Sequence, residues 1–307
     1  MNLQDMTDAL SLHMPSVLRW AGAVAKQLRD FNISVVGKKT SGYDSTDALT
    51  LADLAVQELL VAALRDSAPI LRQCRLEAEE STGDLKRFAS EGPYTIALDP
   101  IDGTRQYRDH SGNGWSVMLN LRSHETVHYS LVFIPESGET GTWVEAVGDR
   151  IVCGEDDPNQ PATSVLQKLT PLDAGTRPHS KKIYLTGFPD RDVATLEAVT
   201  RVGLEGCTSE RLPGCVYELF ARGALGGALI HTPNVYDFPV ILHLARLLGG
   251  DALWVHNREP VHFETLWVDE RADMLRLPGI VACSASEETL ATLCDLAKTW
   301  DPMRYRG

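Results

Sequence analysis

The stretch YTIALDPIDGTRQY, residues 94–107, starts with an uncharged, mostly apolar run and ends with two aspartates three positions apart, followed by glycine and threonine. The apolar run predicts a buried strand. A strand that reaches Asp99 and Asp102 next to a flexible glycine has two interpretations. It ends in an ordinary Asx turn, or it ends where a metal ion and a phosphate group meet.

Composition limits the classes of partner. The chain has 307 residues, of which 43% are hydrophobic and 23% charged, so we expect one large or two fused globular domains. A formal net charge of −13 argues against nucleic acid polymers and anionic membranes as partners, because the basic surface that they require is missing. It does not argue against a small anionic substrate, since bound cations invert the charge locally. The six cysteines have no zinc-site spacing, and no apolar run or leader-like pattern points to a membrane or to secretion, so we expect a reduced cytoplasmic protein.

The segments around the opening stretch predict mixed α and β structure. Apolar residues recur with helical spacing over 3–30, and a second helix is expected to begin at a capping box, Thr50 to Asp53. Residues 37–48 are rich in turn formers and predict a loop. Two hairpins are expected, one at WSVMLNL and VHYSLVFI (115–121 and 127–134) and one at TWVEA and RIVCG. The Pro- and Asp-rich stretch at 154–164 predicts a domain boundary, and strands alternate with helices beyond it.

Three further acidic motifs have simple structural interpretations when they are taken singly. Glu79-Glu80 fits a solvated acidic loop. Asp237 fits the N-cap of a helix with Pro239 in its first turn, and Asp53 fits a first-turn acid that is favoured by the helix dipole. Taken together they favour a site, because most of these carboxylates lie at strand ends or helix starts, where the functional groups of α/β folds gather.

The chemistry of the acidic residues indicates a hard cation. Ligands that are all oxygen suit Mg²⁺ and not zinc. Two carboxylates from one tight turn do not both stay ionised side by side without a cation between them. A carboxylate that bridges two ions is the arrangement used for in-line displacement at phosphorus. Phosphatases with a nucleophilic aspartate in a D-x-D-x-T pattern are excluded, because the spacing here is D-x-x-D-G-T.

The order of these motifs resembles that of the inositol monophosphatase superfamily, Mg²⁺-dependent and lithium-sensitive phosphatases with the pattern D, EE, DP(I/L)D(G/S)T, WD, GG. The matching residues are Asp53, Glu79-Glu80, DPIDGT (99–104), Tyr236-Asp237 and Gly249-Gly250. The resemblance covers nearly the whole chain and implies an α/β (α+β) fold, a layered αβαβα sandwich of the sugar-phosphatase type with two sheets and flanking helices. It also implies a homodimer, an N-terminal domain (1–153) with most of the metal ligands, and a C-terminal domain (165–307) that supplies Asp237 and the substrate contacts.

The resemblance further implies a role for each matching residue. Glu79, Asp99 and the carbonyl of Ile101 would hold one Mg²⁺, and Asp99, Asp102 and Asp237 a second, with Glu79 contributing to a weaker third. Gly103 and Thr104 would bind the phosphate, and Asp53 with Thr104 would orient the attacking water. The implied activity is that of a Mg²⁺-dependent phosphomonoesterase, a phosphoric monoester hydrolase in which a metal-activated water attacks the ester of a small phosphorylated metabolite directly.

The chain departs from the family pattern where the substrate would be recognised. No acidic residue lies between Gly227 and Asp237, so inositol monophosphate itself is not expected to be the best substrate. His231 either faces the substrate together with Thr232 or is structural. Arg105 either binds a second phosphate or is a surface arginine. An inositol, sugar or nucleotide phosphate is therefore expected, with a 3′(2′),5′-bisphosphate nucleotidase or a fructose-bisphosphatase-like enzyme as the alternative, and a catalytically weak metal-binding regulatory protein as the non-enzyme alternative.

Overall fold

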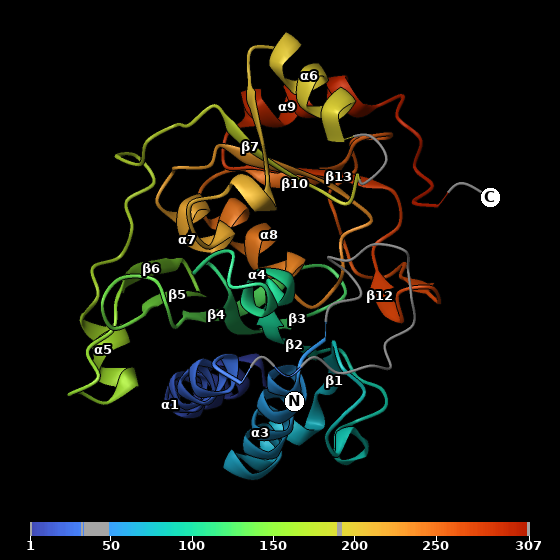
Figure 1. Ribbon diagram of the computed structural model, residues 1–307. Coiled ribbons are helices and arrows are strands. Elements are labelled where there is room, and N and C mark those ends of the chain that lie inside the picture. The colour runs from blue at the N-terminus through green and yellow to red at the C-terminus, as the bar shows by residue number, and fades with distance from the viewer. Residues whose placement is uncertain (1, 32, 34–48, 189–191, 306–307) are drawn as a thin grey trace.

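The computed structural model describes residues 2–31, 33, 49–188 and 192–305. In this part of the chain, helices and two main β-sheets alternate in five layers (Figure 1). None of the described helices is both long and apolar enough to span a membrane. The predicted loop at 37–48 lies outside the described residues.

The first sheet has the strand order β1-β2-β3-β4-β5-β6. Only β1 and β2 are parallel among its neighbouring pairs, and the others are antiparallel. Both predicted hairpins are confirmed, as the pairs β3–β4 and β5–β6. The strands are β1 (Arg75–Ala78), β2 (Thr95–Asp102), β3 (Ser116–Arg122), β4 (Val127–Ile134), β5 (Thr142–Val147) and β6 (Arg150–Glu155).

Two helices, α1 (Leu3–Arg29) and α3 (Leu51–Ser67), pack against each other and cover one face of this sheet (Figure 1). The predicted capping box is confirmed, because the Asp53 carboxylate accepts from the Thr50 backbone N–H at 2.7 Å. The short elements η1 (Pro69–Gln73) and α5 (Ala162–Lys168) pack on these helices, and a further short helix, η2 (Leu85–Arg87), lies between β1 and β2 in the sequence.

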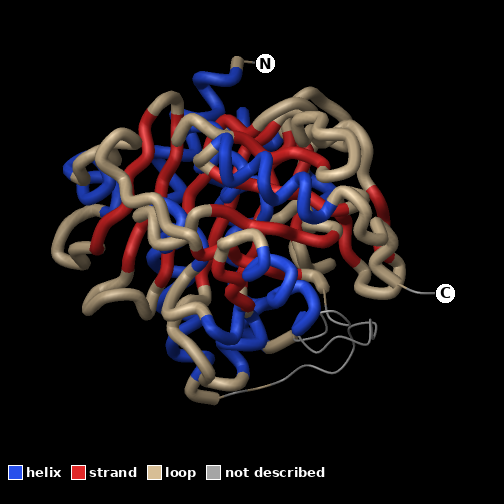
Figure 2. Tube along the Cα trace, turned by 90° about the horizontal axis from the view of Figure 1, so that it is seen from above, coloured by secondary structure: helices blue, strands red, loops and turns tan. Residues whose placement is uncertain are grey.

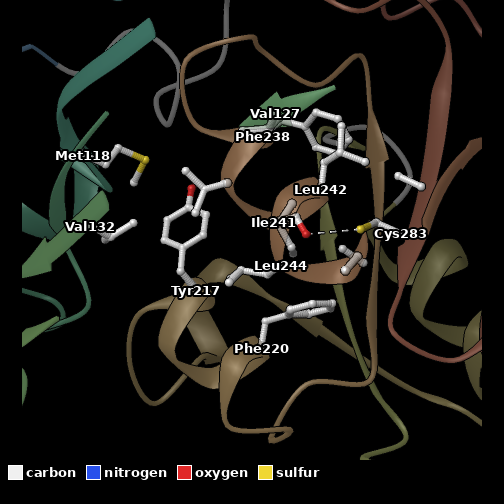
Figure 3. Packing of buried hydrophobic residues seen from close by; sticks show 14 of the residues in the cluster. Met118, Val127, Val132, Tyr217, Phe220, Phe238, Ile241, Leu242, Leu244 and Cys283 are labelled. Carbon is white, nitrogen blue, oxygen red and sulfur yellow. Dashed lines mark hydrogen bonds between the residues drawn. The ribbon is translucent and has the colours of Figure 1, made fainter. Parts of the chain in front are cut away.

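A central helical layer, α7 (Val216–Ala221) and α8 (Phe238–Leu247), separates the two sheets. Every residue of α8 from Phe238 to Ala245 is buried, as expected for a helix that is covered on both sides. Figure 3 shows Met118 and Val132 of the first sheet on one side of the α8 residues and Cys283 of the second sheet on the other, all within the same core. Residues from both predicted domains thus share one core, and the division of the chain at 154–164 stays a prediction.

The second sheet has the order β10-β13-β9-β7-β8, and the outer layer of α6 (Asp192–Arg201) and α9 (Glu287–Ala297) packs on it. Viewed from above, strands run across the middle of the molecule with helices and loops around them (Figure 2). The αβαβα sandwich expected from the sequence is therefore confirmed. The strands are β7 (Lys182–Thr186), β8 (Glu205–Thr208), β9 (Gly227–His231), β10 (Asp251–Trp254) and β13 (Ile280–Ser284), with a separate pair, β11 (Trp267–Asp269) and β12 (Met274–Arg276).

A buried histidine in the central layer predicts sensitivity to acid. His243 of α8 is 4% exposed, and its Nδ1 lies 3.0 Å from the Ser130 hydroxyl. Burial lowers the pKa of His243 to about 3, and the charge of the neighbouring His128 adds to the shift. A histidine whose pKa is depressed in the folded state stabilises the fold above its unfolded pKa, and this stabilisation is lost as the pH falls toward the folded pKa.

We expect His243 to account for about 2 kcal/mol of the stability that is lost between about pH 8 and pH 5, from its unfolded pKa of about 6.5. Urea unfolding of the wild type and of His243→Gln at both pH values measures this, and the decrease should be smaller by that amount in the variant. His256→Gln, at an exposed position, is the matched control. Equal decreases in all three proteins would contradict the assignment.

Candidate active site

The acidic residues of the first sheet lie at the ends of its two parallel strands. The backbone N–H of Glu79, the residue after β1, donates to the Leu98 carbonyl of β2 at 3.3 Å. Because neighbouring parallel strands end at the same edge of a sheet, Glu79 and Asp99 lie next to each other there. Their side chains are hydrogen-bonded.

A β-bulge brings Asp99 and Asp102 to one site. Residues three apart on a regular strand point to opposite faces. Here Asp99 pairs with Met118 and Asp102 with Ser116, so β2 has one residue more than β3 between the two pairs. The extra residue restores a common direction for the two carboxylates. Pro100 lies within the irregular segment, where its missing N–H removes no ladder bond.

Asp237 joins these two residues from the central layer. Asp99, Asp102 and Asp237 each offer a carboxylate oxygen, and the three oxygens lie within 4.8 Å of one another. Asp237 is the N-cap residue of α8 but makes no capping hydrogen bond through its side chain. Its Oδ2 instead accepts from the Asn234 amide at 3.0 Å, and Asn234 Oδ1 accepts from the Asp237 backbone N–H at 3.0 Å.

The electrostatics of this cluster fit a bound divalent cation. Burial, followed by the charge of Glu79, raises the pKa of Asp99 well above its usual range. Burial, followed by the charge of Asp237, does the same for the pKa of Asp102. Burial and the charge of Glu79 raise the pKa of Asp237 to about 6. Crowded carboxylates of this kind keep protons unless a cation replaces them, and an all-oxygen donor set is the one that Mg²⁺ prefers.

A buried glutamine fixes the position of the Glu79 loop. Gln57 of α3 is fully buried, and its amide nitrogen donates to the carbonyls of Glu80 and Thr82. Its amide oxygen accepts from the Glu80 N–H at 2.9 Å. Three hydrogen bonds from one side chain thus tie the segment after β1 to the first helical layer.

Asp53 and Thr104 form the second part of the site. The Thr104 hydroxyl lies 3.1 Å from Asp53 Oδ1 and 2.8 Å from the Ile101 carbonyl oxygen. The other oxygen of Asp53 accepts from the Thr50 hydroxyl at 2.6 Å. The two interpretations of Asp53 therefore hold together, since one oxygen caps α3 and the other reaches the site.

The turn from β2 into α4 (Thr104–Arg108) depends on Gly103. Its φ of 84° and ψ of 30° are left-handed, a conformation that disfavours side chains with a Cβ. Arg29 of α1 then holds the turn, because its side chain donates to the Tyr107 carbonyl at 2.9 Å and to the Gly112 carbonyl at 3.0 Å. The first helical layer thus positions both Asp53 and the segment after Asp102.

A cavity of about 580 Å³ opens beside the acidic cluster. Its wall includes Glu79, Asp99, Ile101, Asp102, Gly103, Thr104 and Asp237, together with Arg105 and His231. The structure thus brings every sequence-predicted site residue except Asp53 to this cavity wall, and Asp53 contacts Thr104 from behind it.

Arg105 and His231 reach the cavity in different ways. Arg105 is 41% exposed in its side chain and lies 2.8 Å from Glu210 and 3.7 Å from Asp109. His231 is buried, and its Nε2 donates to the Asp301 carbonyl at 3.1 Å while its ring packs edge-on against Phe188. His231 is thus tied to the C-terminal segment, and a contact of either residue with substrate stays a prediction.

Several residues at the site were not expected from the sequence. Tyr217 of α7 is buried at the cavity wall and hydrogen-bonds to Asp102. Asn234 orients Asp237, and the side chains of Arg276 and Arg304 lie in the same wall. Of these, only Asn234 had a local signal, since an asparagine three residues before an acid at a helix start favours an Asx turn. The other three lie in segments with no motif.

Comparisons with known proteins agree with this geometry. A family model described as the inositol monophosphatase family matches residues 8–191, more than half of the chain. No curated protein matches. Solved structures match over nearly the whole chain, and three of them illustrate the likeness.

The extragenic suppressor protein suhB from Bartonella henselae is 15% identical with a TM-score of 0.63, and the match covers 94% of this chain and 98% of that one. An inositol monophosphatase from Anabaena (Nostoc) sp. PCC 7120 is 16% identical, with a TM-score of 0.60 and 99% of both chains covered. CysQ from Bacteroides thetaiotaomicron is 18% identical, with a TM-score of 0.61, covering 93% of this chain and 100% of that one. At these identities the structures support the fold, and the family model supports the membership. The chain belongs to the inositol monophosphatase family and is a phosphoric monoester hydrolase.

Proposed function

We propose that this protein is a Mg²⁺-dependent phosphomonoesterase that hydrolyses a small phosphorylated metabolite by direct attack of water. The observation that carries the proposal is that carboxylate oxygens of Asp99, Asp102 and Asp237 lie within 4.8 Å of one another in the wall of a cavity. No nucleophilic side chain is needed, because water is the attacking group. The alternative, a catalytically weak metal-binding regulatory protein, would be favoured if no phosphorylated metabolite released phosphate.

The acidic cluster is the proposed site for two to three Mg²⁺ ions. Glu79, Asp99 and the Ile101 carbonyl would hold one ion, and Asp99, Asp102 and Asp237 another. A bound Mg²⁺ neutralises phosphate charge, favours the ionised form of a water and stabilises the leaving oxygen. A solved relative described as an IMPase/NADP phosphatase, 15% identical to this chain, is complexed with Mg²⁺ and phosphate, which supports this choice of cation.

The chain's own residues would position the phosphate and the water. The backbone N–H groups of Gly103 and Thr104 start α4, where donors are available to an anion. The Thr104 hydroxyl has one hydrogen and two acceptors within reach, Asp53 and the Ile101 carbonyl. Whichever it bonds, a hydroxyl lone pair stays available to a water donor, so Thr104 can fix the direction from which water attacks.

The proposed substrate is an inositol, sugar or nucleotide phosphate other than a simple inositol monophosphate. Relatives of this fold support the breadth of this class, since SaIMPase-II, 14% and 15% identical in two structures, binds inositol monophosphate in one and 2′-AMP in the other. The cavity wall from Ile230 to Asn234 presents no acidic residue to the hydroxyls of an inositol ring. Sensitivity to lithium and assembly as a homodimer stay predictions from the family resemblance.

Phosphate release from a panel of inositol, sugar and nucleotide phosphates, with Mg²⁺ and with excess chelator, tests the proposal. We expect release from at least one substrate class with Mg²⁺ and none with chelator, because the crowded carboxylates need a cation to act on a phosphate. Full activity in chelator would contradict the metal requirement. Absence of release from the whole panel would favour the regulatory alternative, and myo-inositol 1-phosphate as the best substrate would contradict the substrate class.

A further inference from the structure

The C-terminal segment from Asp301 to Tyr305, here called the C-terminal strap, forms part of the cavity wall. It follows α9 and runs down the right-hand edge of the molecule in Figure 1. His231, the last residue of β9, and Thr232, the next residue, hold the strap. The His231 Nε2 donates to the Asp301 carbonyl. Arg304 Nη1 donates to the His231 carbonyl at 3.2 Å and to the Thr232 hydroxyl at 3.1 Å. Arg304 is one of the residues that line the cavity containing the acidic cluster.

A second arginine, Arg276, also contacts Thr232. Arg276 of β12 donates from Nη1 to the Thr232 carbonyl at 3.1 Å and from Nε to Asp269 Oδ2 at 2.8 Å. Arg304 Nε lies 4.0 Å from the same oxygen of Asp269. One fully buried carboxylate thus contacts two guanidinium groups, and Thr232 is bonded to both.

The two arginines are close enough to repel each other. Each side chain is only 6% exposed. Both guanidinium groups approach the same oxygen of Asp269, and burial, followed by the charge of Arg276, lowers the pKa of Arg304. Asp269 supplies one negative charge against these two buried positive charges, and an anion in the adjoining cavity would add a second.

The backbone at Thr232 is held in a costly conformation for these contacts. Its φ is 48°, which is left-handed and unfavourable for a β-branched residue. The Thr232 N–H donates to the Gly279 carbonyl at 2.7 Å, and its carbonyl and hydroxyl both accept from the arginines. Such strain persists where the surroundings enforce it, and it concentrates in ligand-binding sites.

The arginines have a defined position relative to the acidic cluster. The backbones of Arg276 and Asn234 form an isolated antiparallel β-bridge, and the Asn234 side-chain amide donates to the Asp237 carboxylate. The short segment from Thr232 to Asp237 therefore connects the basic and the acidic parts of one cavity wall. A ligand in the cavity would meet carboxylates on one part of the wall and the two arginines on the neighbouring part.

We propose that Arg276 and Arg304 form an anion subsite that binds a second phosphate or a carboxylate of the substrate, distinct from the phosphate ester at the acidic cluster. The guanidinium group of an arginine binds either a phosphate or a carboxylate through two hydrogen bonds. The geometry therefore indicates a negatively charged group but does not distinguish a phosphate from a carboxylate. This proposal rests on the proposed function and narrows its substrate class to molecules with two anionic groups. The C-terminal strap then determines specificity.

Matched substrate pairs test the subsite, each pair sharing one ester and differing in the second anion. Suitable pairs are fructose 1-phosphate with fructose 1,6-bisphosphate, adenosine 2′-phosphate with adenosine 2′,5′-bisphosphate, and glycerol 2-phosphate with 2-phosphoglycerate. We expect the doubly anionic member of at least one pair to have the higher kcat/KM, and the phosphate and carboxylate pairs tell the two anions apart. Arg304→Met should lower that kcat/KM by about 10-fold or more through KM, as expected for loss of a charge-assisted hydrogen bond.

Three controls separate substrate binding from a structural role of the strap. Arg271 packs on the Tyr305 ring at 4.5 Å but lies outside the described cavity wall, so Arg271→Met should leave both members of a pair unchanged. The singly anionic member should change by less than about twofold in Arg304→Met, because it makes no charge-assisted contact there. Arg304→Lys keeps the charge and should recover part of the preference. Equal losses for both members, or no preference in any pair, would overturn the proposal.

Calorimetric binding of the same pairs to the wild-type protein tests the subsite without a variant and without turnover. The doubly anionic member of at least one pair should bind about 10-fold more tightly or better, and equal affinities throughout would overturn the subsite even if Arg304→Met does not fold. The proposed function fails in a different way, namely when no member releases phosphate with Mg²⁺. A binding preference without any release would therefore support the subsite and contradict the enzyme.

Discussion

Asp102→Asn and Asp237→Asn are each expected to lower turnover by about 10²- to 10³-fold, the range found when one group that stabilises transition-state charge is removed. Each change removes a full negative charge from the acidic cluster and keeps the side-chain volume. Asp102 and Asp237 each contribute one of the three carboxylate oxygens that lie within 4.8 Å of one another. An asparagine at either position leaves one fewer carboxylate for the metal ions. Kinetics at saturating Mg²⁺ on a substrate from the panel measure the loss.

The same variants should be at least as stable as the wild type when Mg²⁺ is absent. Burial and neighbouring charge raise the pKa of Asp237 to about 6, above the value of an unfolded aspartate. An acid with a raised folded pKa destabilises the fold increasingly as the pH rises through the range between the two values, and a neutral asparagine removes that penalty. Added Mg²⁺ should raise the melting temperature of the wild type at about pH 7.5 more than that of either variant, since a ligand stabilises only what binds it.

Glu145→Gln is the matched control for these two expected effects, the lower turnover and the smaller stabilisation by Mg²⁺. Glu145 is also a buried acid, 4% exposed, but it is bonded to Tyr129 in the first sheet and is not among the residues of the cavity wall that the structure describes. It should leave turnover and the Mg²⁺-induced stabilisation unchanged. Wild-type turnover in Asp102→Asn or Asp237→Asn would mean that the residue is not a metal ligand in the sense proposed.

The acidic cluster could be predicted because its members lie in short local motifs. Glu79 and Asp99 follow an apolar run at the edge of a sheet, and two parallel strands bring such ends together whatever the rest of the fold. The bulge that turns Asp102 toward Asp99 could not be predicted. It is defined by the register with β3, where Met118 and Ser116 are the partners, and register is a property of the pair of strands.

In helix α1, too, the sequence predicts the type of element but not which of its residues are buried. Apolar residues at helical spacing in the first 30 positions predicted α1, but which of them face the core depends on the packing. Val17 and Val24 fit the spacing and are only partly buried, whereas their neighbours Leu18 and Ala25 are fully buried. The type of element follows from periodicity, and the exact buried face follows from the sheet beneath it.

The basic part of the cavity wall, Arg276 and Arg304, has no counterpart in the sequence motifs. Arg276 and Arg304 come from β12 and from the C-terminal strap, and both meet at Thr232, which is distant from Arg304 along the chain. Neither arginine lies in a pattern that predicts a role. They become neighbours because β9 and the strap lie side by side, which is a tertiary relation. Substrate specificity is thus the part of the function that sequence patterns describe least.

Asp53 and Thr104 are expected to act as one unit, so that the losses from Asp53→Asn and Thr104→Ala do not add. Asp53 Oδ1 lies 3.1 Å from the Thr104 hydroxyl, which is the group proposed to orient the attacking water. Removing either partner should misplace the water and lower turnover by about 10²-fold, as errors of position do. The double variant should be barely slower than the slower single variant, because residues in one hydrogen-bonded unit are non-additive.

The capping role of Asp53 makes a separate control necessary, and the chain offers one. Thr50→Ala removes the hydroxyl that donates to Asp53 Oδ2 at 2.6 Å and leaves the contact between Asp53 and Thr104 in place. It should lower the free energy of unfolding by about 1 kcal/mol, as loss of a helix cap does, with little change in turnover. Asp53→Asn should lower turnover far more than this loss of stability explains, at unchanged affinity for Mg²⁺. Additive losses in the double variant, or an Asp53→Asn protein as active as Thr50→Ala, would limit Asp53 to capping α3 and would leave Thr104 as a phosphate contact.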